Sequence, residues 1–127
     1  MINIISQTGN STEIHTMKFK VTGRIWIETE QGTFAGLGRI TLLERIQKYG
    51  SITRAAKSMK MSYRQAWELI DSMNKQSDLP LVNKVSGGVG GGGSVLTEEG
   101  ARVITEYLKL HAEFQKFNEI ETTNLRL

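Results

Sequence analysis

The sequence predicts an α+β fold in which a few short helices are flanked by β-hairpins, and three observations lead to this prediction. Two short helical patterns follow one another between Gly50 and Lys75, with only two residues separating them. A strand pattern, a glycine-rich segment at 86–94 and a second strand pattern come next. A long amphipathic helical pattern then runs over about 98–121. These features are typical of a winged helix-turn-helix, here with an N-terminal β-hairpin and a long C-terminal dimerisation helix.

Composition limits the class of protein. A chain of 127 residues with 39% hydrophobic and 23% charged residues fits one soluble domain with a single core, which we expect over residues 17–127. No apolar run approaches the roughly 20 residues that span a bilayer, so no membrane partner is expected. Residues 1–15 lack the basic start and apolar stretch of a secretory signal. The absence of cysteine excludes disulfides and thiolate metal sites, and fits a cytoplasmic location.

Positive charge gathers in one segment. The chain has a formal net charge of +3 and a pI near 9.3, which permits an anionic partner without requiring one. Residues 52–77 hold five basic and two acidic residues, so this segment alone accounts for the net charge of the chain. The basic residues are Arg54, Lys57, Lys60, Arg64 and Lys75. An anionic partner is therefore expected at the helix pair.

The residues before the helices predict a hairpin. Residues 1–16 are polar and rich in serine and threonine, and we expect a weakly ordered or edge-strand extension there. Apolar and polar residues alternate over 17–28, which is the pattern of a half-buried strand. A turn at Gln31-Gly32 and a short returning strand at 33–35 complete the hairpin. Trp26 falls on the polar face, where we expect cross-strand or interface packing rather than a binding aromatic.

Three helices are predicted to form the centre of the fold. The first covers 39–49 and ends at Gly50, a typical helix-terminating residue. Ser51 and Ser62 are good N-caps for the two short helices that follow. Both of these helices place apolar residues at i, i+3, i+4 and i+7. The Ala55-Ala56 pair allows them to cross closely, because crossing helices approach only where side chains are small.

The second short helix, over about 62–76, divides into two faces. Ala66, Ile70 and Met73 lie on one side. The opposite side is centred on Arg64, Glu68, Asp71 and Lys75. In helix-turn-helix proteins the first turn of such a helix reaches base edges in the major groove of DNA. A solvated helix face in a protein that binds no nucleic acid is the alternative interpretation.

The glycine-rich segment predicts the tip of a wing. Six glycines lie between Ser86 and Ser94, with a strand predicted at 81–85 and a returning strand from Val95. Glycine amides can approach phosphates closely because no side chain intervenes. A nucleotide-binding loop is excluded, since Gly93 replaces the required lysine and no helix opens directly behind the segment. A flexible hairpin tip without phosphate contacts remains an equal alternative.

The last helix carries a seam of apolar residues that is expected to meet a second subunit. Thr97 is a suitable N-cap, and the two glutamates after it are favourably placed at the positive end of the helix dipole. The seam has heptad-like spacing and consists of Val103, Tyr107, Leu110, Phe114 and Phe117. Packing on the core of the same chain is the alternative, and we favour the interface.

The sequence offers little for catalysis. Its two histidines, His15 and His111, are far apart, and with no cysteine they predict no metal cluster. No G-x-S-x-G element suggests serine catalysis. We therefore expect neither an enzyme nor a bound cofactor.

Four motifs resemble one family. They are GRITLLERI at 38–46, GSITRAAK at 50–57, MSYRQAWELIDSMN at 61–74 and SGGVGGGGSVLTEEG at 86–100. In these motifs the chain resembles the DNA-binding domain of ModE-type molybdate-responsive regulators, distant relatives of the LysR-type winged helices. The resemblance covers about 17–120. It implies a winged helix-turn-helix that dimerises through its terminal helices and binds operator DNA.

The resemblance also implies which residues touch DNA. Residues 62–65 would contact bases or phosphates, with Lys84 and the glycine tip near the backbone. Taken with the sequence patterns, it gives these expected contacts: Ser51, Thr53, Arg54, Ser62, Tyr63, Arg64, Gln65, Trp67, Lys75, Lys84, Gly90 and Gly91. Trp67 is included as part of the family motif, where it either packs or contacts DNA.

The expected function is a dimeric, sequence-specific transcriptional regulator that binds double-stranded DNA. Full-length members of the family carry C-terminal molybdate-binding domains, so molybdate would be a ligand only if another domain or protein supplies its site. A winged-helix module that binds a protein instead of DNA is the alternative. A small oxyanion binder is a third hypothesis, and it rests on the family association and the glycine loop alone.

Overall fold

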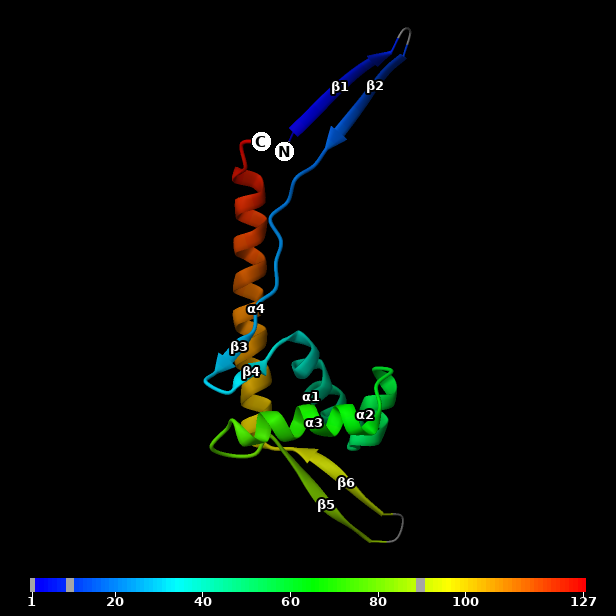
Figure 1. Cartoon of the computed structure of the whole chain (residues 1–127), viewed down its shortest axis with the longest axis vertical. Helices are drawn as coiled ribbons and strands as arrows, with labels where there is room; N and C mark the ends of the chain where they lie inside the picture. The colour runs from blue at the N-terminus through cyan, green and yellow to red at the C-terminus, as the bar shows by residue number, and fades with distance from the viewer. Residues whose placement is uncertain (1, 9–10, 89–90) are drawn as a thin grey trace. The chain divides into compact units, whose positions relative to one another are not determined.

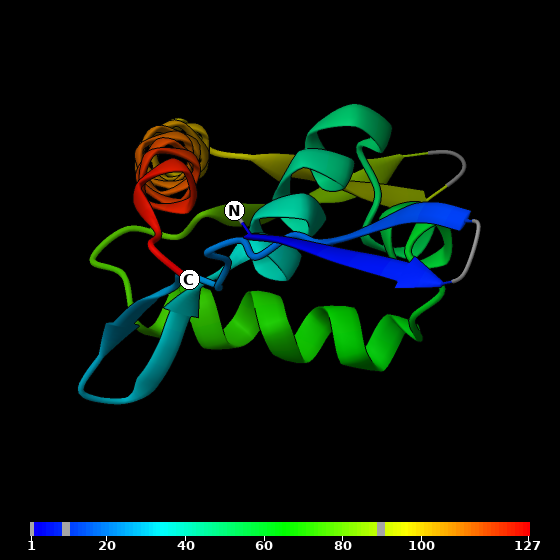
Figure 2. The same ribbon diagram turned by 90° about the horizontal axis from the view of Figure 1, so that it is seen from above.

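The computed structural model describes residues 2–8, 11–88 and 91–127, and side chains over 18–85 and 93–127 (Figures 1 and 2). Its strands pair as antiparallel hairpins, β1 with β2, β3 with β4 and β5 with β6. The elements in order are β1 (Ile2–Thr8), β2 (Ser11–Met17), β3 (Ile27–Thr29), β4 (Gly32–Ala35), α1 (Leu37–Tyr49), α2 (Ile52–Ser58), α3 (Tyr63–Lys75), β5 (Val82–Gly88), β6 (Gly91–Leu96) and α4 (Glu98–Asn124).

The chain divides into two compact units, and α4 contributes to both. One unit comprises Ile25–Lys109, and the other comprises Met1–Arg24 with Leu110–Leu127. In the first unit, the three short helices gather above the β5-β6 hairpin, which projects from them (Figure 1). This arrangement of a helix pair and a following hairpin is the winged helix-turn-helix that the sequence predicts. The α+β class is therefore confirmed.

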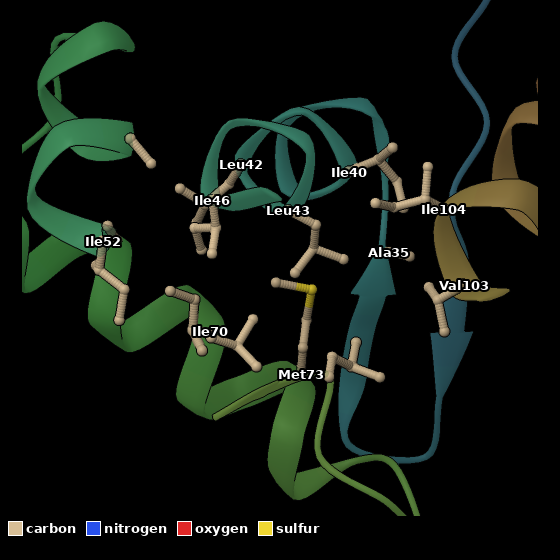
Figure 3. Close-up of a cluster of buried hydrophobic side chains, with 14 of the residues drawn as sticks. Ala35, Ile40, Leu42, Leu43, Ile46, Ile52, Ile70, Met73, Val103 and Ile104 are labelled. Carbon is tan, nitrogen blue, oxygen red and sulfur yellow. The ribbon is translucent and has the colours of Figure 1, made fainter. Parts of the chain in front are cut away.

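The core of the Ile25–Lys109 unit lies between α1, α2 and α3 and extends to β4 and the start of α4 (Figure 3). The α1 residues Ile40, Leu42, Leu43 and Ile46 are completely buried. Met73 of α3 is likewise completely buried. The alanines Ala55, Ala56 and Ala66 are buried where α2 and α3 meet α1 and one another, so the small side chains permit the close crossing that the sequence predicts.

The helices start and stop at local signals. Gly50 adopts φ 64° and its N–H donates to Ile46 O at 2.8 Å, which ends α1 in the left-handed conformation that favours glycine. Ser51 caps α2 by accepting from Arg54 N at 3.1 Å. Between α2 and α3, Lys60 has φ 58°, so the sharp turn places a lysine in the left-handed region. Ser62 caps α3 by accepting from Gln65 N at 3.0 Å.

The base of the wing is fixed to the helices by hydrogen bonds. Asn74 of α3 accepts from Leu81 N at 2.8 Å and donates to Val82 O at 3.1 Å, so it holds the start of β5. Ser94 N of β6 donates to Gly50 O at 3.0 Å. Thr97 accepts from Gly100 N at 2.9 Å and donates to Pro80 O at 2.7 Å. The hairpin is thus tied to the ends of α1, α3 and α4.

The predicted strand over 17–28 is wrong for most of its length. Residues 18–26 have no regular secondary structure, and β3 covers only Ile27–Thr29. The backbone finds a partner on a helix instead, since Val21 N donates to Thr122 Oγ1 at 2.7 Å. A Cβ at Gly23 would lie 3.2 Å from Phe114 Cζ, so the chain passes close to α4 there. The four residues of β4 are too few to pair with a longer strand.

Other elements differ from the predictions in extent. Residues 2–8 and 11–17 pair as the β1-β2 hairpin, in register from Ile2 opposite Met17. α1 begins at Leu37, two residues before its predicted start, and α4 continues to Asn124. Among the described residues, no helix has the length and apolar character that crossing a membrane requires.

Candidate DNA-binding surface

The exposed face of α3 carries the residues that the sequence selects for reading bases. Arg64 is 87% exposed and Tyr63 is 43% exposed, whereas Ala66 and Ile70 on the opposite face are fully buried. The division of this helix into a core face and a solvent face is confirmed. Arg64 Nε donates to Glu68 Oε2 at 3.2 Å, so the two side chains form an i, i+4 ion pair along the exposed face.

Side chains at the start of α3 also form the N-terminal cap of this helix. Gln65 Oε1 accepts from Ser62 N at 3.1 Å, and Ser62 Oγ accepts from Gln65 N, which completes a capping box. The paired hydrogen bonds by which a glutamine recognises adenine require the same Oε1. Base reading by Gln65 would therefore have to share this acceptor with the cap or give the cap up, and Gln65 is a weaker candidate for it than Arg64.

A groove of about 250 Å³ lies between α2, α3 and the wing. Hydroxyl-bearing residues from the two helix starts, Ser51, Thr53 and Tyr63, share it with the ammonium-bearing Lys84 of β5. The remaining lining residues are Ile52, Val85, Gly93 and Ser94. Hydroxyl and ammonium donors around one hollow suit an anion such as a phosphate. Four of these residues, Ser51, Thr53, Tyr63 and Lys84, are among the expected DNA contacts, and the structure brings the four together.

Three cationic side chains on or beside this surface lie over aromatic rings. Lys84 Nζ is 4.5 Å from the centre of the Trp67 ring. The Arg54 guanidinium is 5.2 Å from the centre of the Tyr49 ring, with Lys48 Nζ at 5.3 Å from the same ring. Sequence reasoning missed Tyr49 and Lys48. No periodic signal could have found Tyr49 as a site residue, because its contact with Arg54 crosses from α1 to α2.

Lys75 stands apart from the groove. It lies at the last position of α3, about 18 Å along the helix axis from Tyr63 at roughly 1.5 Å per residue. Lys75 Nζ is 2.8 Å from Asp71 Oδ2. This hydrogen bond raises the pKa of the Lys75 ammonium above its ordinary value. Because Asp71 offsets its charge, Lys75 is a weaker candidate for phosphate contact than Lys84.

The wing differs from the flexible loop predicted over 86–94. β5 extends to Gly88 and β6 begins at Gly91, with Gly88 opposite Gly91 in the register. Most of the glycines therefore lie within paired strands. Gly91 opens β6, whereas Gly90 lies outside the described residues.

The predicted subunit seam is split, and two of its five members need correction. Val103 is 8% exposed and Tyr107 only 1%, and both belong to the core of their own chain. Tyr107 Oη donates to Ile25 O at 2.8 Å, and burial raises the pKa of the Tyr107 hydroxyl, so it remains a protonated donor. The part of the chain that covers these residues is distant in sequence, which hid the burial from the heptad pattern.

The rest of the seam lies in the unit formed by Met1–Arg24 and Leu110–Leu127. Phe117 is 55% exposed and Leu110 is 40% exposed. Ile120, which the prediction omitted, is 57% exposed. Phe114 is partly buried beside Gly23. Along this part of α4 the side chains of Leu110, Phe117 and Ile120 are thus apolar and open to solvent.

Known proteins match this chain over the region that contains the groove. A family model described as bacterial regulatory helix-turn-helix protein, lysR family, matches residues 37–101, from the start of α1 into the first turn of α4. The chain is 46% identical to the molybdenum transport protein ModE of Azotobacter vinelandii over 92 residues, which are 72% of this chain and 34% of the relative. It is 44% identical to the DNA-binding transcriptional dual regulator ModE of Escherichia coli K12 over 81 residues, 64% of this chain and 31% of the relative.

A third relative extends the match along this chain. The transcriptional regulator ModE of Yersinia pestis is 41% identical over 102 residues, 80% of this chain and 39% of the relative. The matched regions thus cover about a third of the length of these relatives. The matched family region contains α2, α3 and the wing, which are the elements that form the groove. The chain therefore belongs to the lysR family of bacterial regulatory helix-turn-helix proteins, and it is similar to the ModE regulators in this region.

Proposed function

We propose that this chain binds double-stranded DNA as a dimeric, sequence-specific transcriptional regulator. In this proposal α3 enters the major groove and the β5-β6 wing follows the backbone. One observation supports it most. Arg64 is exposed at the start of α3, and its neighbour Tyr63 lines a groove of hydroxyl and ammonium groups. We keep residues 17–127 as the functional domain, acting in the cytoplasm where bacterial DNA lies.

The two parts of the surface have different tasks in the proposed complex. The cations and the groove would hold phosphates, which fixes the register of the protein on the duplex without reading sequence. Arg64 would read a base. An arginine whose Nε is held by a carboxylate, as Arg64 is by Glu68, still has Nη1 and Nη2 to donate to O6 and N7 of one guanine. The ion pair therefore orders the side chain that makes the specific contact.

Replacing Arg64 with alanine is expected to weaken binding to the preferred DNA site by about 1–3 kcal/mol, which is roughly 5- to 150-fold in Kd. The loss should be smaller on scrambled DNA, because only the base contact distinguishes the two sequences. Fluorescence anisotropy with labelled duplexes measures both affinities. Arg102→Ala is the matched control, since Arg102 is an exposed helical arginine with an acidic partner, Glu99, at the start of α4. An equal loss on both DNAs would contradict base reading by Arg64.

The exposed apolar residues of α4 support the dimer part of the proposal. Leu110, Phe117 and Ile120 would pack against the same residues of a second copy in a two-fold interface. Because each substitution occurs twice in such a dimer, Phe117→Lys is expected to weaken association by roughly 3–6 kcal/mol. Sedimentation velocity should find the unchanged protein at twice the 14.2 kDa chain mass and the variant at the mass of one chain.

A matched substitution tests whether the added charge alone disrupts the dimer. Gln115 is exposed on the same helix and is not part of the apolar group, so Gln115→Lys should remain dimeric. A monomeric unchanged protein at micromolar concentration would contradict the proposed dimer. So would a Phe117→Lys variant that stays dimeric.

Molybdate has a limited place in the proposal. The name of the Azotobacter vinelandii relative refers to molybdenum transport, and that of the Escherichia coli relative refers to transcription. For this chain we propose that any response to molybdate is supplied by another domain or protein. The protein-binding alternative has no specific observation in its favour.

A further inference from the structure

Trp67 of α3 and Lys84 of β5 meet across the junction between the recognition helix and the wing. Lys84 Nζ lies 4.5 Å from the centre of the Trp67 ring, which is within the range of a cation–π interaction. Trp67 is partly buried and packs against the hydrophobic core. Lys84 is exposed and lines the groove that also contains Tyr63. The ring is therefore a fixed support, and the ammonium is the group that solvent or a ligand can reach.

We propose that Trp67 is a positioning residue for DNA binding, and that its ring holds the Lys84 ammonium at the groove where a DNA phosphate binds. This inference rests on the proposed function and deepens it. Family resemblance includes Trp67 among the candidate DNA-binding residues and leaves open whether it packs or touches DNA. In our proposal Trp67 acts through Lys84, and the phosphate contact belongs to Lys84.

The backbone around the pair is held so that the contact can persist. Asn74 fixes the start of β5 through Leu81 and Val82, which are three and two residues before Lys84. The opposite strand is fixed by the hydrogen bond from Ser94 N to Gly50 O, and Ser94 is the register partner of Lys84. The wing is thus tied to the helices on both strands, at the start of β5 and opposite Lys84 on β6.

Holding this lysine in place has a clear energetic benefit. A free lysine side chain has several rotatable bonds, and ordering it at a phosphate costs conformational entropy. A ring beneath the ammonium restricts those rotamers before DNA arrives. Tryptophan provides the strongest cation–π interaction among the aromatic residues, and the ring itself remains packed on the core. Affinity therefore depends on Trp67 only while Lys84 is present.

A double-mutant cycle tests this dependence. Trp67→Leu, Lys84→Met and the double variant are compared for DNA affinity and for the slope of log affinity against log salt concentration. Lys84→Met should reduce the magnitude of the slope by about 1, as expected for one lost phosphate contact. Trp67→Leu should lower affinity about 2- to 5-fold when Lys84 is present, and cause no further loss in the Lys84→Met protein. Trp67→Phe should retain most of the affinity.

Two outcomes of the cycle would overturn the proposal. If Trp67→Leu has the same effect with and without Lys84, the ring contacts DNA directly or has only a structural role. If Trp67→Leu leaves affinity unchanged in both proteins, the ring does not position Lys84. Should Trp67→Leu fail to fold, the cycle is run with Trp67→Phe, where the smaller ring should give a smaller loss that again disappears with Lys84→Met.

A second measurement needs no DNA and separates this proposal from the proposed function. The chain has two tryptophans, so Trp26→Phe leaves Trp67 as the only one. In that protein, Lys84→Met should shift the emission maximum of Trp67, whereas Lys109→Met on α4 should leave it unchanged. An unshifted spectrum would contradict the ring–ammonium contact. A shifted spectrum from a protein that binds no DNA would keep the contact and reject the function.

Discussion

Gly100→Ala is expected to lower the free energy of unfolding by about 3 kcal/mol, because a Cβ at this position has no space. It would collide with Leu81 O and lie 2.6 Å from Leu96 Cδ1. Leu81 O cannot move away freely, since it accepts hydrogen bonds from Thr97 N at 2.9 Å and from Thr97 Oγ1 at 3.1 Å. The start of α4 would have to separate from the base of the wing.

The matched control for this substitution lies in another helix. Gly38 is in the first turn of α1, and a Cβ there would meet no atom within 4 Å. Gly38→Ala should therefore stabilise the protein by about 0.5–1 kcal/mol, through the better helix propensity of alanine. Urea unfolding followed by circular dichroism measures both variants. A Gly100→Ala protein as stable as the unchanged one would contradict the close packing of α4 on the wing.

Raising the salt concentration from 50 to 200 mM is expected to weaken DNA binding by about 10³-fold or more. Within residues 52–84, the cations without an acidic partner among the described ion pairs are Arg54, Lys57, Lys60 and Lys84. A dimer brings two of each to the DNA, which lies within the six to ten phosphate contacts that give a fall of this size. Arg64 and Lys75 are left out of this number because Glu68 and Asp71 offset their charges.

Affinity measured at several salt concentrations on one duplex gives the slope directly. Circular dichroism at each concentration verifies that the protein stays folded, so that the loss belongs to binding. A change of about tenfold or less over this range would mean that few phosphates are contacted. The assignment of α2, α3 and the wing as a DNA surface would then fail.

The central helices could be predicted from sequence because their signals are local. Ser51 and Ser62 cap α2 and α3 through hydrogen bonds to residues three positions away, and Gly50 ends α1 through its own φ. The apolar spacing in α3 gives its buried face because helix geometry alone decides which residues share a side. The exposed position of Arg64 followed from the same geometry.

The features that sequence analysis missed depend on contacts between distant segments. Alternation over 17–28 indicated a strand, but Val21 binds Thr122, a hundred residues further along the chain. The burial of Tyr107 follows from its place among side chains of other segments, and its hydroxyl reaches Ile25 O. The support of Lys84 by Trp67 arises only when the wing folds back beside α3. In each case the local pattern is present, but the contact that decides the residue's structure is made with a segment distant in sequence.

The central claim is that the start of α3 reads a DNA sequence while a two-fold assembly presents two copies of it. Selection of bound duplexes from a random DNA pool, performed with the unchanged protein and with Arg64→Ala, tests this claim most directly. The unchanged protein should enrich an inverted repeat with half-sites one helical turn of DNA or a multiple apart, and Arg64→Ala should lose the preference at one base pair in each half. A pool that shows no enriched motif, or the same motif with Arg64→Ala, would contradict the account.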